Sequence, residues 1–135
     1  MFDIKSLAVK DTSDLHLRSA DDELLFTEDG KPITITVYGP GSKAYAKAET
    51  AQNNRMLDRL KKKGKADQTP DEKIAEQAEF LAACTKSFNN FSYGGLAGDE
   101  QFKACYSDKS VGFIGEQVGK HIADWGNFTQ GSAKN

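Results

Sequence analysis

The stretch Lys31-Pro-Ile-Thr-Ile-Thr-Val-Tyr-Gly-Pro-Gly-Ser-Lys43 decides the fold of this chain. Within it, Ile33, Ile35 and Val37 alternate with threonine and tyrosine, and this period of two predicts a strand with one buried face. The Gly39-Pro40-Gly41 triplet then ends the strand, because proline has no backbone N–H to donate and glycine permits a sharp turn. We expect the segments before this strand to pair with it and the segments after it to cover it.

Two helices are predicted after this corner. Ser42 is suited to cap the first, which extends to about Lys63 and is rich in alanine and other good helix formers. The second begins at Thr69-Pro70-Asp71-Glu72, which combines a capping box with proline at the first helical position. Its apolar residues recur at helical spacing to Phe88, so the sequence predicts one continuous helix to about that residue.

The segments before the stretch predict further β structure. Residues 23–27 are a strand candidate, and Asp29-Gly30 after them is a strong hairpin signal, because both residue types tolerate positive φ. Leu15-His16-Leu17 alternates and is a candidate for a further short strand. The apolar patch within residues 1–13 fits either a first strand or a loosely held arm.

Two more helices complete the expected fold. One begins near Asp99, and the last covers about residues 108–125. The last helix has one apolar face, formed by Val111, Ile114, Val118, Ile122 and Trp125. We predict an α+β fold in which a small N-terminal antiparallel β-hairpin or sheet precedes three to four packed α-helices.

The chain is expected to form a single domain over residues 1–135. Its β-rich part covers about residues 1–40, its helical part about residues 42–126, and residues 129–135 are predicted to be a flexible tail. No apolar run reaches the roughly 18–20 residues that cross a bilayer, and we expect no signal peptide. The net charge of −2 gives no electrostatic footprint for nucleic acid or an anionic membrane, so neither is expected as a partner.

Cys84, Cys105 and His121 are the residues from which a zinc site or a Cys–His nucleophile would be built. None of them shows ligand spacing such as C-x-x-C or H-x-x-x-H, so we favour free thiols packed in a core. We therefore predict no catalytic residue, no metal site and no cofactor. The basic run of residues 59–65 is interpreted as a solvated helix end, because no aromatic residue interleaves it.

The glycines inside the last helix are unusual, because each costs about 1 kcal/mol relative to alanine. Gly112, Gly119 and Ala123 fall almost on one line of the helix, with Gly115 nearby. A stripe of small residues lets another backbone come close. It fits either tight packing inside the domain or a contact with another subunit or partner, and the sequence leaves both open.

Several segments resemble tail assembly chaperones of long-tailed siphophages and related prophages. Gly30-Lys-Pro-Ile-Thr-Ile-Thr-Val-Tyr-Gly-Pro-Gly-Ser-Lys-Ala-Tyr45 resembles the strand-to-helix segment of that family. Leu81-Ala-Ala-Cys-Thr-Lys-Ser-Phe-Asn-Asn-Phe91 resembles its helix end and the aromatic–asparagine loop that follows. Shorter matches come in the same order at Tyr106-Ser-Asp, Glu116-Gln-Val and Gly126-Asn-Phe128. The resemblance covers roughly residues 23–128.

This chain departs from the family pattern at two places. Phe88 stands where many relatives have tryptophan, and the glycine-rich loop of residues 92–98 stands where a proline-containing segment is expected. These departures bear on the details of the loop.

The resemblance implies a non-enzymatic role in viral tail assembly. Such proteins bind the long, largely helical tape measure protein, keep it soluble and help to recruit the tail tube protein. They are absent from the mature virion, which places them in the host cytoplasm. In many such phages a programmed ribosomal frameshift makes a C-terminally extended product, and this extension is thought to bring in the tube protein.

We predict that apolar residues of the helical half contact the client or further copies of the chain. Phe113 is singled out because it falls off the apolar stripe of its helix. The candidate partner-binding residues are Phe88, Phe91, Tyr93, Gly112, Phe113, Gly115 and Gly119. The aromatic members fit equally well as core or loop anchors. A homo-oligomer is expected, because so small a sheet leaves edges that invite pairing.

Two alternatives from other classes stay open. The first is a structural tail or head–tail connector component, which would be found in purified virions. The second is an enzyme with a Cys or His centre, which requires Cys84 or Cys105 to be exposed beside His121.

Overall fold

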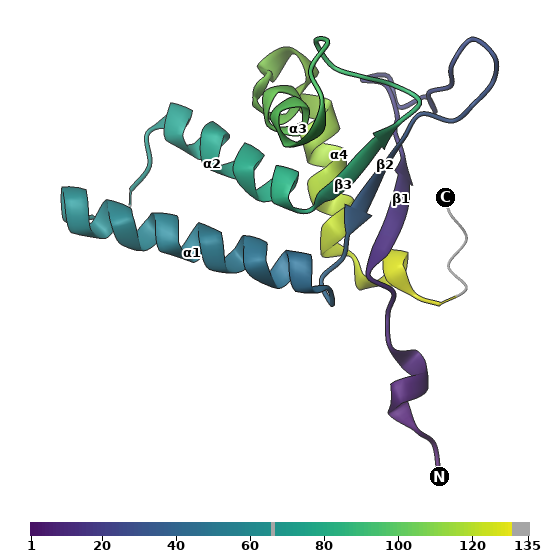
Figure 1. Cartoon of the computed structure of the whole chain (residues 1–135), viewed down its shortest axis with the longest axis horizontal. Helices are drawn as coiled ribbons and strands as arrows, with labels where there is room; N and C mark the ends of the chain where they lie inside the picture. Colours follow the sequence, from purple (N-terminus) through teal and green to yellow (C-terminus); the bar gives the residue numbers. More distant parts are fainter. Residues whose placement is uncertain (66, 131–135) are drawn as a thin grey trace.

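The computed structural model describes residues 1–65 and 67–130, and it has an α+β fold (Figure 1). A three-stranded antiparallel sheet, in the order β1-β2-β3, is accompanied by four α-helices in the described part of the chain. The strands are β1 (Thr12–His16), β2 (Thr34–Tyr38) and β3 (Thr85–Asn89). The α-helices are α1 (Lys43–Lys63), α2 (Pro70–Ala83), α3 (Gly98–Ser107) and α4 (Gly112–Ala123). Short 3₁₀ helices are η1 (Ile4–Leu7), η2 (Lys109–Val111) and η3 (Trp125–Phe128).

The central strand, β2, is the strand that the alternating pattern predicts. Ile35 and Val37 are fully buried, whereas Thr34, Thr36 and Tyr38, which alternate with them, are half-buried. The corner after β2 is confirmed as well, and Ser42 caps α1 by accepting from the Tyr45 N–H at 3.1 Å. Gly39 lies against the Phe128 ring of η3, so the corner is also a point of tertiary contact.

The partner of β2 differs from the one expected. Residues 23–27 are not a strand, and β1 pairs with β2 instead, with Leu15 opposite Ile35. The Asp29-Gly30 turn is confirmed, and the Thr27 N–H donates to the Lys31 carbonyl across it at 2.8 Å. Gly30 has φ +86°, whereas Asp29 does not adopt the positive φ expected of it. Residues 17–33 form a long excursion beyond the three strands. It contains the isolated bridges Arg18–Leu24 and Phe26–Pro32 and backbone hydrogen bonds such as that from the Leu17 N–H to the Ile33 carbonyl at 3.0 Å. At the N-terminus, η1 replaces the possible first strand, and residues 1–8 project from the body as an exposed arm (Figure 1).

The predicted continuation of the second helix to Phe88 is wrong. Helix α2 ends at Ala83, and Thr85–Asn89 runs as β3 along the second edge of β2. The strand is preferred because this edge supplies backbone partners: the Tyr38 N–H donates to the Cys84 carbonyl at 2.7 Å. The sheet is therefore not confined to the N-terminal forty residues, since its third strand lies inside the part expected to be helical.

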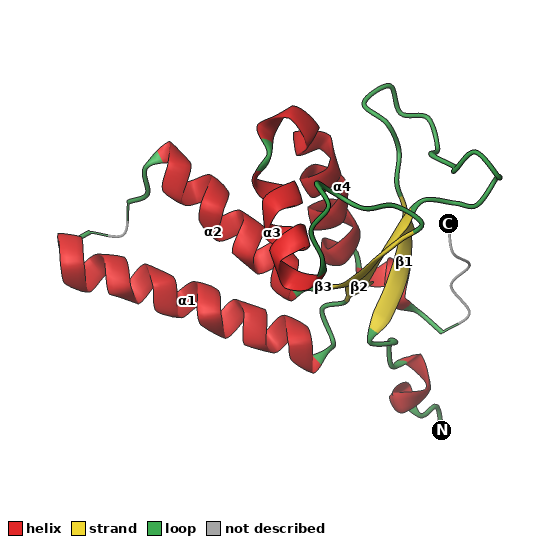
Figure 2. Ribbon diagram, turned by 45° about the horizontal axis from the view of Figure 1, so that its top comes forward, coloured by secondary structure: helices red, strands yellow, loops and turns green. Residues whose placement is uncertain are grey.

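Helices α1 and α2 form a hairpin that extends away from the sheet (Figures 1 and 2). The capping box of α2 is confirmed: the Glu72 N–H donates to Thr69 Oγ1 at 3.1 Å, and the Thr69 N–H donates to Glu72 Oε1 at 2.9 Å. Three ion pairs join the two helices along the hairpin. They are Arg55–Glu79 at 3.3 Å, Arg59–Glu76, and Lys63–Glu72 at 2.7 Å.

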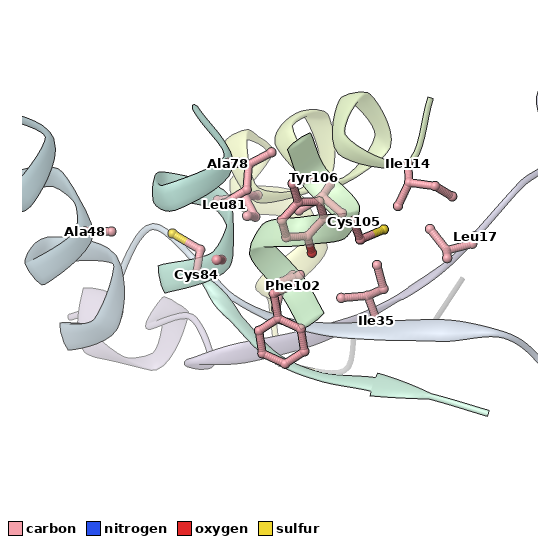
Figure 3. Close-up of a cluster of buried hydrophobic side chains, with 14 of the residues drawn as sticks. Leu17, Ile35, Ala48, Ala78, Leu81, Cys84, Phe102, Cys105, Tyr106 and Ile114 are labelled. Carbon is pink, nitrogen blue, oxygen red and sulfur yellow. The ribbon is translucent and has the colours of Figure 1, made fainter. Parts of the chain in front are cut away.

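The core lies between the sheet and helices α2, α3 and α4 (Figure 3). Ile114, Val118 and Ile122 of α4 are buried in it, as the apolar stripe predicts. Trp125 is not, because α4 ends at Ala123 and the chain turns into η3, which leaves the Trp125 side chain 55% exposed. The predicted tail falls mostly on residues 131–135, which lie outside the described residues. No helix of the described chain is both long enough and apolar enough to cross a membrane.

Candidate functional site

One concave surface of the helical half is a groove between α2 and α4. It consists of two hollows, of about 200 Å³ and about 400 Å³, that share Gln77 and Leu81 of α2. The first hollow is also bounded by the end of α3 and the start of α4, including Tyr106. The second reaches towards the α1–α2 hairpin, where Gln52 borders it. Because the hollows share two lining residues, we treat them as one groove along α2.

The glycines of α4 line this groove, and they do not all have the same environment. Gly112 and Gly115 border the smaller hollow and Gly119 borders the larger. A Cβ on Gly115 would lie 3.6 Å from Leu81 Cδ1, an ordinary packing contact inside the domain. A Cβ on Gly112 or Gly119 would meet nothing within 4 Å. Internal packing therefore does not require glycine at these two positions, which leave α4 backbone bare beside the groove.

The groove combines apolar side chains with a charged rim. Ile74 and Leu81 contribute apolar surface, and Lys73, Glu76 and Glu116 lie among the lining residues. Glu76 is held by Arg59 and by Gln68, whose Nε2 donates at 2.9 Å. The hydrogen bond from Arg59 holds the pKa of Glu76 below its usual value. The Glu76 carboxylate is therefore fixed in place and ionised at neutral pH. Such a charged rim can flank the apolar face of a helix bound in the groove.

The predicted aromatic contact residues Phe88, Phe91 and Tyr93 do not line this groove, although Phe88 and Tyr93 contact its lining residues Tyr106 and Asp108. Phe88 and Phe91 stack with ring centroids 4.5 Å apart, and Phe88 lies 4.7 Å from the ring of Phe102. The Tyr93 hydroxyl donates to Asp108 Oδ2 at 2.6 Å, which ties its loop to the end of α3. All three candidate residues are partly buried and packed against the core, so the exposure expected of them is not found. Their role in partner binding stays a prediction.

Phe113 is also partly buried, on a different side of α4 from the glycines. It lines a further hollow of about 180 Å³ with Arg18 and other residues of the β1–β2 excursion, and Glu116 lies between this hollow and the groove. Gln117, one turn further along α4, fixes this excursion. The Arg18 N–H donates to Gln117 Oε1 and Gln117 Nε2 donates to the Arg18 carbonyl, both at 2.8 Å. The structure thus brings the glycines together along one groove and separates Phe113 from them.

Cys84 and Cys105 lie in the core, as the sequence analysis favours. Both are buried free thiols, and burial raises the pKa of Cys84 to about 12 and that of Cys105 to about 11. The exposed thiol that the enzyme alternative requires is therefore missing. His121 Nε2 instead shares a hydrogen bond of 2.9 Å with Ser13 Oγ, and burial lowers the His121 pKa. Among the residues the structure describes, no group of three His, Cys, Asp or Glu side chains is arranged to hold a metal ion.

Exposed apolar residues outside the groove are the feature that sequence analysis missed. Met56, Leu57 and Leu60 of α1 have the helical spacing of a buried stripe, yet they are 39–49% exposed because α2 covers only the neighbouring face. Leu24 and Phe26 are exposed on the β1–β2 excursion, whereas Leu25 between them is partly buried against the core. Comparisons with protein-family models, with curated proteins and with solved structures found no match to this chain.

Proposed function

We propose that this protein is a tail assembly chaperone of a long-tailed siphophage. It binds the tape measure protein, keeps it soluble and promotes tail tube assembly, without catalysing a reaction. The proposal rests on the ordered family-like segments within residues 23–128 and on one observation from the fold. That observation is the open groove between α2 and α4, with bare backbone at Gly112 and Gly119.

The groove supports this role through its shape and chemistry. A long helical client exposes apolar faces before assembly, and such faces aggregate unless another protein covers them. An amphipathic helix docks in a groove through side chains that recur every three or four residues. Bare glycine backbone lets the client helix approach closely, as small-residue stripes do between packed helices. The client therefore lies along α4 with its apolar stripe towards Ile74 and Leu81.

Further parts of the proposal concern other partners and location. The tail tube protein is recruited to the complex through a frameshift-extended form of the chain. The chaperone works as a homo-oligomer in the host cytoplasm and does not remain in the mature virion. The resemblance supports these statements, and the free edges of a three-stranded sheet support self-association.

Co-expression with the tape measure protein tests the proposal. The soluble fraction of the tape measure protein is measured with the wild-type chain, with Gly112→Leu/Gly119→Leu, and with Ala75→Leu as a matched control on α2 outside the groove lining. We expect the wild type and the control to keep the client soluble and the double variant to lose most of this effect. Because a Cβ at either glycine position meets nothing within 4 Å and leucine is the better helix former, the double variant should keep or raise its thermal midpoint.

Two results would contradict the proposal. One is a tape measure protein that stays equally soluble without the chain. The other is stoichiometric recovery of the chain from purified mature tails by mass spectrometry, which would favour the alternative of a structural virion component. Equal solubilisation by the wild type and by the groove variant would instead place the client on another surface.

A further inference from the structure

Two exposed apolar surfaces lie at opposite ends of the molecule. We call residues 18–31, between β1 and β2, the acidic loop, and residues 56–65, at the C-terminal half of α1, the basic helix end. The acidic loop exposes Leu24 and Phe26, which are 42% and 53% accessible. The basic helix end exposes Met56, Leu57 and Leu60. Figure 1 shows the two surfaces at the two ends of the long axis, so they cannot meet within one chain.

The acidic loop carries an excess of negative charge. It holds five acidic and two basic side chains, and both basic ones are paired inside the loop. Arg18 pairs with Asp22 at 3.8 Å, and Lys31 pairs with Asp29 at 3.7 Å. The acidic side chains without an ion-pair partner in the described chain are Asp21, Glu23 and Glu28. They border the two exposed apolar side chains in sequence.

The basic helix end has the opposite balance. It holds five basic side chains against one acidic, Asp58. Arg59 and Lys63 face α2 and pair with its glutamates. Lys61 and Lys62 are exposed and form no ion pair with any described residue. Lys61 follows Leu57 by four residues, so the two lie on the same face of α1.

We infer that the acidic loop of one copy docks on the basic helix end of a second copy. Apolar residues meet at the centre of this contact, and opposite charges surround them. Complementary charge steers the two surfaces together and sets their orientation, and the apolar contact holds them. A symmetric pairing of two basic helix ends or two acidic loops would place like charges together. The head-to-tail arrangement of two copies is therefore favoured over either symmetric pairing.

This arrangement has a consequence for assembly. The two surfaces differ, so each copy in a pair keeps one surface free, and a third copy can bind. Such heterologous contacts form rings when they close and open chains when they do not. Each surface exposes only two or three apolar side chains, so we expect weak, concentration-dependent assembly beyond the dimer. The contact specifies the self-association that the proposed function includes. It uses neither the groove nor the client, so its failure is distinguishable from a failure of client binding.

Sedimentation velocity on the purified chain tests this contact. The wild type should show a weight-average mass that rises with protein concentration at 50 mM NaCl. The rise should shrink at 500 mM NaCl, because salt screens exposed charges. A mass that stays monomeric at every concentration and at low salt would overturn the inference.

Charge reversal identifies the surfaces. Lys61→Glu/Lys62→Glu and Glu23→Lys/Glu28→Lys should each be monomeric alone, because each variant places like charges at both surfaces. An equimolar mixture should assemble again, because the reversed end of one variant matches the reversed loop of the other. Lys5→Glu/Lys86→Glu, which changes the net charge as the lysine variant does but at other exposed positions, should assemble like the wild type. Circular dichroism confirms that the variants are folded.

Two outcomes would contradict this choice of surfaces. Undiminished assembly of either reversed variant alone would place the contact elsewhere. Loss of assembly on removing residues 1–8 with both surfaces intact would assign it to the exposed N-terminal arm. Phe26→Ser and Leu57→Ser separate the apolar part, and both should abolish assembly. Leu57→Ser should leave the thermal midpoint nearly unchanged, whereas Phe26→Ser also removes the edge contact of that ring with His16 at 4.9 Å.

Discussion

Replacing Gly39 with alanine is expected to destabilise the fold, although the backbone at this position needs no positive φ. A Cβ at residue 39 would lie 2.4 Å, 2.6 Å and 2.7 Å from three carbon atoms of the Phe128 ring. These distances are far shorter than any normal carbon–carbon contact. The ring has no room to yield, because Phe128 is fully buried and its carbonyl accepts from the Lys10 N–H at 2.7 Å. The added methyl must therefore displace η3 or the corner after β2.

The magnitude follows from the cost of overpacking a core. Inserting a methyl into a well-packed site costs about 1–3 kcal/mol. For a domain of this size, each kcal/mol lowers the thermal midpoint by roughly 3–5 °C. Gly39→Ala should therefore melt roughly 3–15 °C below the wild type in a reversible thermal unfolding experiment followed by circular dichroism. Gly112→Ala is the matched control, because its Cβ meets open space and alanine is the better helix former by about 1 kcal/mol.

A double-mutant cycle decides whether Phe128 is the cause. Phe128→Ala alone should cost about 3–5 kcal/mol, because it removes a fully buried ring. The cavity then accepts the methyl at residue 39, so the double variant should be more stable than the sum of the two single effects by about 1–3 kcal/mol. Additive effects, or a Gly39→Ala melting curve that coincides with that of the wild type, would refute the reasoning.

Three further predictions concern ionisable groups. Side-chain hydrogen bonds from Lys63 and Arg59 lower the pKa values of Glu72 and Glu76. The stability that these two ion pairs add is therefore present above about pH 4.5 and is lost as the pH falls through the folded-state pKa values. Amide exchange in α1 should accelerate over that pH range, and less steeply in Glu76→Gln. Burial lowers the His121 pKa below 6.5, so the unfolded chain binds more protons in acid than the folded chain does. The thermal midpoint should therefore decrease as the pH is lowered from 6.5. His121→Asn should remove this pH dependence, and a dependence that persists would assign it to another group. Cys84 and Cys105 should resist alkylation at pH 8 until denaturant is added, and rapid labelling of the native chain, read by mass spectrometry, would contradict their burial.

The elements that sequence predicted correctly are those fixed by local chemistry. Strand β2 follows from its alternating β-branched residues, and the starts of α1 and α2 follow from Ser42 and from the Thr69–Glu72 capping box. Each of these signals acts within a few residues, so no distant segment is needed to decide it. The α+β class follows in turn, because one strand with a buried face and several amphipathic helices must cover one another.

The misjudged elements are those that distant segments decide against the local pattern. Thr85 and Phe88 fit a helical stripe that continues α2, yet residues 85–89 form a strand. The free edge of β2 decides between them, and that edge exists only once β1 has taken the other side. Trp125 shows the same limit, because its burial depends on where α4 ends.

The candidate site also has one part that local spacing predicts and one part that packing decides. Spacing alone places Gly112, Gly115 and Gly119 on one side of a helix, and the fold confirms that they face one groove. Only the tertiary structure separates them, because Leu81 of α2 approaches Gly115 and nothing approaches Gly112 or Gly119. Sequence thus determined which surfaces the chain presents, since helical and strand periods are local. The packing of distant segments decided which of those surfaces are covered, since burial depends on neighbours that no local pattern specifies.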